Sequence, residues 1–161
     1  YYTEEISLKE ITEIYEFREL IEISLLEKTI DRIKTPGLKK LEKALSNHLE
    51  AVRDIFLKDR LMRDMEFHLV LANLSGCRTQ INTLRHLFDL LYLKYRGNVL
   101  FVTPMETVDS EHIRIYECIT AGDLDGAKAV LASHISNVKK HALISIEKMT
   151  RKKNTKSILH S

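Results

Sequence analysis

The chain has 161 residues, of which 44% are hydrophobic and 30% are charged, and its formal net charge at pH 7 is +2. This length fits one domain with a full hydrophobic core, and the near-balanced charge argues against a broad phosphate-binding surface. Five glycines and two prolines leave little material for the turns of an all-β fold. The composition therefore favours long helices.

Cysteine usage and hydropathy bear on the cellular compartment. Cys77 and Cys118 are isolated, without the spacing of a metal-binding or redox pair, and nothing resembles a signal peptide or a run long enough to span a membrane. We therefore expect a cytoplasmic protein without membrane contact. Because the sequence begins at Tyr1 rather than Met, we also expect a fragment of a longer protein.

The first helix is predicted from a capping box formed by Ser7 and Glu10, and its apolar pattern continues to about Ile33. Arg18 occupies a position of the apolar stripe, so its side chain is expected to point inward. Two partners are open for it: a salt bridge to Glu22, one turn further on, or the carboxylate of a ligand bound in a cavity.

The second to fourth helices follow from the same kinds of signal. Thr35 and Pro36 form an N-cap and a first-turn proline for a helix that extends to about Phe56. Gly76 suits the left-handed residue after a third helix, and the apolar side of a fourth helix ends at about Tyr95. His48, in the second helix, is expected to be a packed or half-exposed histidine with no obvious ligand partner.

The fifth helix begins either at Thr103 or at a rival N-cap, Asp109. Gly122 and Asp123 end it and start a sixth helix, which we expect to reach about Lys148. The predicted fold is thus all-α, an antiparallel bundle of about six helices.

Asp64 and His68 are the most informative polar pair in the sequence. They lie four residues apart on the apolar side of the third predicted helix, and therefore share one face. An unpaired carboxylate in such surroundings would cost several kcal/mol, on the order quoted for buried ions. We predict that a divalent metal ion pairs with it.

His112 and His134 are expected to supply the remaining ligands. They lie at nearly equal distances on either side of the turn between the last two helices, so at about 1.5 Å per residue both sit roughly 15 to 17 Å from it. His141 would lie about 10 Å further along the last helix, too far to share the same ion. Three imidazoles and one carboxylate suit zinc, nickel, manganese or iron.

Two readings compete with a metal-dependent sensor. A helical metalloenzyme of the DinB type would use the same ligands to activate water, with Glu66 or Glu111 turned inward as the general base. A metal-free interaction bundle would instead pair Asp64 with Arg18 or with a protonated histidine. We favour the sensor and expect no enzymatic activity.

Four landmarks between about Lys9 and Ile146 carry a resemblance to a known family. They are Ile14–Glu22 in the first helix, Asp64-x-x-x-His68 with Phe67 before the histidine, Glu111-His112 with Ile115, and Gly122-Asp123 through Ala127 to His134-Ile135. Together they resemble the C-terminal ligand-binding (FCD) domain of the FadR subfamily of GntR transcription regulators. The family's usual Gly-Asn after the third helix is Gly76-Cys77 here, a departure that touches no expected ligand.

The resemblance implies a set of site residues. In metal-containing members an aspartate and three histidines bind the ion, and these match Asp64, His68, His112 and His134. The effector is a small organic acid or sugar acid beside the metal, with a first-helix arginine on its carboxylate, which Arg18 matches. Arg96 is a further effector-binding candidate, with an ordinary surface arginine as the alternative; the metal would be zinc, nickel or manganese.

The resemblance also implies a domain organisation and partners. Residues 1–8 would be the end of an interdomain linker and residues 9–150 a helical effector-binding and dimerisation domain. The basic composition of residues 151–161 separately favours a flexible tail, with a contact to nucleic acid as the alternative. The protein would be a homodimer whose operator affinity responds to the effector. The winged helix-turn-helix domain that should come first is absent from this sequence, so DNA binding is expected only of the parent protein.

Overall fold

The computed structural model describes residues 7–51, 57–95 and 105–158, and within these ranges the chain is entirely helical. Six helices form a bundle, which confirms the predicted fold class. They are α1 (Leu8–Arg32), α2 (Thr35–Ala51), α3 (Leu57–Leu74), α4 (Arg78–Tyr95), α5 (Met105–Ala121) and α6 (Leu124–Ile158).

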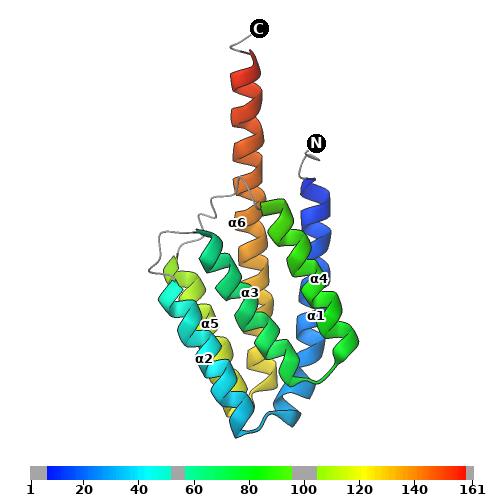
Figure 1. Ribbon diagram of the computed structural model, residues 1–161, viewed down its shortest axis with the longest axis vertical. Coiled ribbons are helices and arrows are strands. Elements are labelled where there is room, and N and C mark those ends of the chain that lie inside the picture. The colour runs from blue at the N-terminus through cyan, green and yellow to red at the C-terminus, as the bar shows by residue number, and fades with distance from the viewer. Residues whose placement is uncertain (1–6, 52–56, 96–104, 159–161) are drawn as a thin grey trace.

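Consecutive helices alternate in direction along the long axis of the bundle (Figure 1). α1 packs against α3, α4 and α6, while α2 packs against α3 and α5. α6 lies between α1 and α5 and extends beyond the other helices at the end of the bundle where α1 begins (Figure 1). None of the described helices is both long and apolar enough to cross a membrane.

The predicted caps bound the helices. The Ser7 hydroxyl accepts a hydrogen bond of 3.3 Å from the Glu10 amide at the start of α1. Gly76 and Gly122 both have φ of +70°, the left-handed conformation that glycine adopts without steric cost. The Asp123 carboxylate accepts a 2.9 Å hydrogen bond from the Gly126 amide and caps α6.

The structure excludes one of the two expected starts of α5 and contradicts the expected end of α6. α5 is continuous from Met105, so Asp109 is not an N-cap; its carboxylate faces His48 instead, at 3.6 Å. α6 ends at Ile158 rather than near Lys148, because no glycine or proline interrupts it after Gly126, and lysine and arginine suit the last turns of a helix. The expected ends at Phe56 and Thr103 lie outside the described residues.

The core consists of apolar side chains from all six helices. Its largest fully buried apolar members are Tyr15, Phe67, Ile11, Leu25, Leu26, Leu41, Leu84, Leu91, Ile115, Ile119 and Leu131. Six buried residues stand out because they are charged or carry imidazoles: Arg18, Glu22, His48, His68, His112 and His134. Polar groups persist in such a core only when they are paired or bind a ligand, so these six mark an internal site.

Candidate metal centre

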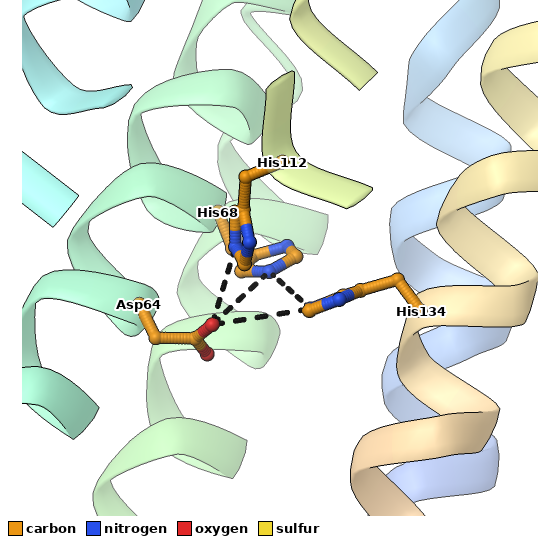
Figure 2. A group of neighbouring side chains, drawn as sticks. All are labelled: Asp64, His68, His112 and His134. Carbon is orange, nitrogen blue, oxygen red and sulfur yellow. Dashed lines mark hydrogen bonds and ion pairs between the residues drawn. The ribbon is translucent and has the colours of Figure 1, made fainter. Parts of the chain in front are cut away.

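Four side chains from three helices converge inside the bundle (Figure 2). Asp64 and His68 come from α3, His112 from α5 and His134 from α6. One ligating atom of each lies within 4.8 Å of the others. The three imidazoles are fully buried, while the Asp64 side chain is 14% exposed. The structure therefore brings together the four residues that the sequence singled out.

The hairpin of α5 and α6 explains how distant histidines meet. The connection at Gly122 is so short that the two helices pack antiparallel, and the rings of His112 and His134 lie 4.5 Å apart between their centroids. The expectation that these two histidines lie at the same height is confirmed. His141, further along α6, is not a member of the cluster.

The separations between donor atoms fit a single ion. Asp64 Oδ1 lies 3.2 Å from His112 Nε2 and 3.9 Å from Nε2 of both His68 and His134. The two last nitrogens are 3.2 Å apart. Nitrogen and oxygen ligands at about 2.0 to 2.2 Å from a shared metal are about 3 to 4 Å from one another. The four atoms could therefore hold one divalent ion.

Carboxylates occupy the outer nitrogens of two of these imidazoles. Glu22 Oε2 lies 2.6 Å from His68 Nδ1, and Glu111 Oε2 lies 2.9 Å from His134 Nδ1. Because an ionised carboxylate only accepts hydrogen bonds, each Nδ1 is the protonated nitrogen and each Nε2 presents a lone pair to the centre. This is the arrangement by which proteins orient histidine ligands toward a metal.

The charge states at the centre favour a bound cation. Burial lowers the pKa of His68 and lowers the pKa of His134 to about 4, so both rings are neutral at pH 7. Burial alone would raise the pKa of Asp64, but the hydrogen bond with His112 holds it well below its usual range. Two lone pairs and a carboxylate that face one another repel unless a positive charge lies between them.

Glu22 and Glu111 are two residues of the centre that the sequence does not predict as such. The sequence predicts Glu22 only as a salt-bridge partner of Arg18, and Glu111 only as a possible general base of an enzyme. Glu111 does turn inward, but it binds His134 and accepts a 2.6 Å hydrogen bond from Asn137. The one available signal was that Glu22 lies within an apolar stripe, where a carboxylate requires partners.

Arg18 is buried beside the centre, as expected from its place in the apolar stripe. Its Nε donates a 2.5 Å hydrogen bond to Glu22 Oε1, so the salt bridge is present. Its Nη2 has no hydrogen-bond partner among the described residues. Asp64 pairs with His112 and not with Arg18, in contrast to one form of the metal-free alternative. Arg96 lies outside the described residues.

Comparisons with known proteins identify the family. The family model described as the FCD domain matches residues 13–137. The HTH-type transcriptional regulator YdhC of Bacillus subtilis, which is itself uncharacterized, is 28% identical over 141 residues, covering 84% of this chain and 61% of that protein. This chain thus spans about three-fifths of that relative's length.

Solved structures agree with this match. A GntR protein of Streptococcus agalactiae superimposes with a TM-score of 0.71 at 25% identity, over 82% of this chain and 59% of that one. The metal-free FCD domain of TM0439 has a TM-score of 0.71 at 21% identity, over 89% of this chain and 98% of that one; at this identity the likeness shows the fold alone.

The matched relatives are transcription regulators and not enzymes, which agrees with the expectation that this chain has no catalytic role. The family model covers most of the chain and contains all four residues of the cluster. The chain therefore belongs to the FCD domain family and is the FCD domain of a GntR-family transcription regulator.

Proposed function

We propose that this domain senses a small organic acid or sugar acid bound beside a divalent metal, and that the metal is held by Asp64, His68, His112 and His134. The observation that carries the proposal is the geometry of the donor set. Three buried imidazoles and one carboxylate converge on a point, and two of the imidazoles are oriented by carboxylates from outside. Zinc, nickel and manganese all suit these donors.

When bound, the ion supplies a Lewis-acidic position at which an oxygen of the effector carboxylate can coordinate. A side chain of the domain would bind the remaining oxygen of the effector carboxylate. Arg18 Nη2 is a buried donor without a partner among the described residues, a situation that costs about 1 to 3 kcal/mol. A carboxylate beside the ion would remove this cost, so we assign Arg18 as the second anchor of the acid.

Glu22 connects Arg18 with the proposed metal ligand His68. One of its oxygens accepts from Arg18 Nε and the other faces His68 Nδ1. Burial alone would raise the pKa of Glu22, but the Arg18 guanidinium and the hydrogen bonds from His68 and Arg18 lower it to about 2. An ionised Glu22 therefore holds the effector anchor on α1 in a fixed position relative to the metal ligand on α3.

Signal transmission requires that the effector bind one arrangement of the helices more tightly than another. The proposed effector anchor lies on α1, and the proposed metal ligands lie on α3, α5 and α6. An acid that draws these side chains together would change how the four helices pack. We propose that this change acts on a homodimer and on a DNA-binding domain elsewhere in the parent protein, in the cytoplasm. The HTH-type name of the curated relative supports this partner domain.

The first test is elemental analysis of the purified domain, paired with melting curves with and without chelator and across a panel of carboxylic acids. We expect about one metal ion per chain and a lower melting temperature after chelation. An acid at about 100 times its dissociation constant should then add roughly 2.7 kcal/mol of stability.

Asp64→Ala should abolish both metal binding and the response to acids, because it removes the only charged ligand of the set. His141→Ala is the matched control, since His141 lies on α6 outside the cluster. Full metal content in Asp64→Ala would overturn the assignment of the site.

A further inference from the structure

His48 is a buried histidine that the proposed metal site does not use. It lies on α2, which supplies none of the four donors, and its exposed fraction is only 3%. Neither of its ring nitrogens has a hydrogen-bond partner among the described residues. An imidazole offers two polar atoms, and leaving both unpaired inside a core is unfavourable. A molecule that enters the site is a natural partner for them.

Its position connects it to the candidate metal centre. The ring of His48 stacks on that of His112, with centroids 4.0 Å apart and an angle of 30° between the planes. His48 is not one of the four converging donors, but it is in direct contact with one of them, His112. A ligand of a few carbon atoms could touch both the centre and His48.

Asp109 determines which chemical group can bind beside His48. Its Oδ1 lies 3.6 Å from His48 Nε2, which is too long for a direct hydrogen bond. A hydroxyl group lodged there can accept from the imidazole N–H and donate to the carboxylate. A second carboxylate would be repelled by Asp109. The Asp109 side chain is 25% exposed, so this end of the site borders on solvent.

We infer that His48 and Asp109 form a subsite for a hydroxyl group, and that the effector is a hydroxy acid with its carboxylate toward the metal and Arg18. This inference rests on the proposed function. His48 on α2 would then determine ligand selectivity, and the domain would discriminate between acids that differ only in one hydroxyl group.

The test uses calorimetric titration of the metal-loaded domain with matched acids, namely lactate against propionate and malate against succinate. We expect the hydroxy acid of at least one pair to bind about tenfold more tightly. His48→Phe keeps the stacking surface and removes both polar atoms. It should abolish that preference, so that the two acids of the pair bind the variant with equal affinity. Asp109→Asn, which keeps the shape of the side chain, should weaken the preference independently.

The outcomes separate this inference from the proposed function. A wild-type domain that binds acids without regard to the hydroxyl group would overturn the inference alone. A preference that survives in His48→Phe would mean that the hydroxyl group binds the metal rather than His48, and would also overturn it. No metal and no acid binding in the wild-type domain would overturn both. If His48→Phe does not fold, the Asp109→Asn result decides.

Discussion

Glu22 and His68 form a hydrogen bond of 2.6 Å between α1 and α3, inside the hydrophobic core. The same carboxylate also pairs with Arg18. One acidic side chain thus connects a candidate effector anchor with a candidate metal ligand. The bond fixes the His68 tautomer and lets its Nε2 face the other donors.

Glu22→Gln should weaken both metal binding and folding. A neutral amide leaves the Arg18 charge buried without an ionised partner, so the free energy of unfolding should fall by about 3 to 5 kcal/mol. Loss of the outer hydrogen bond should lower metal affinity by about 10- to 100-fold. Urea unfolding and competitive metal titration measure the two effects. Glu66→Gln, an exposed glutamate on α3 paired with Arg63, is the control and should change neither. Unchanged metal affinity in Glu22→Gln would contradict the role given to Glu22.

Glu111→Gln tests the second outer carboxylate. Glu111 holds His134 Nδ1, so its loss should also reduce metal affinity by about 10- to 100-fold. Its side chain is 14% exposed and carries no buried cation, so the loss of stability should be smaller than for Glu22→Gln. Glu117→Gln, an exposed position on α5, is the matched control. Equal metal affinity in the Glu111 and Glu117 variants would contradict this prediction.

The metal-free domain should lose stability in mild acid. Burial lowers the pKa of His134 from 6.5 to about 4, so between these values the unfolded chain binds a proton that the folded one does not. The free energy of unfolding should therefore fall by about 2 kcal/mol for this group from pH 7 to pH 5. Urea titrations with a chelator at pH 7, 6 and 5 measure the change.

Glu22 also makes the stability of the folded domain depend on pH. Its effect lies at lower pH than that of His134, and it too lowers the free energy of unfolding as the pH falls. Its pKa is lowered from 4.5 to about 2 in the folded domain, so its stabilisation is complete above about pH 4.5 and is lost as the pH falls toward 2. Stability that stayed constant or rose between pH 7 and 5 would show that His134 is not neutral in the folded domain.

Asp123→Ala should destabilise the hairpin that aligns His112 and His134. Its carboxylate caps α6 through the Gly126 amide, and loss of such a cap costs about 1 kcal/mol. Thermal unfolding of the metal-free domain measures this cost. Ser7→Ala, which removes the cap of α1, should cost about the same without affecting the hairpin. A melting temperature equal to that of the wild type would show that the Asp123 side chain adds nothing to the turn.

Local sequence signals were sufficient for most helix boundaries. Ser7, Gly76 and Asp123 act through contacts with residues close to them in the chain, so their effects are visible in the sequence. The predicted end of α6 near Lys148 is wrong, because the basic run that follows it continues the helix, and lysine and arginine favour helices.

The sequence alone determined that Asp64 and His68 share one helix face and that His112 and His134 lie level with each other, because both follow from the fixed rise and period of an α-helix. Only the tertiary structure decided which groups complete the site. Glu22 lies 46 residues from His68, and His48 reaches His112 from a different helix. Such contacts depend on how helices cross and rotate against one another, which packing of the whole core determines and no local pattern encodes.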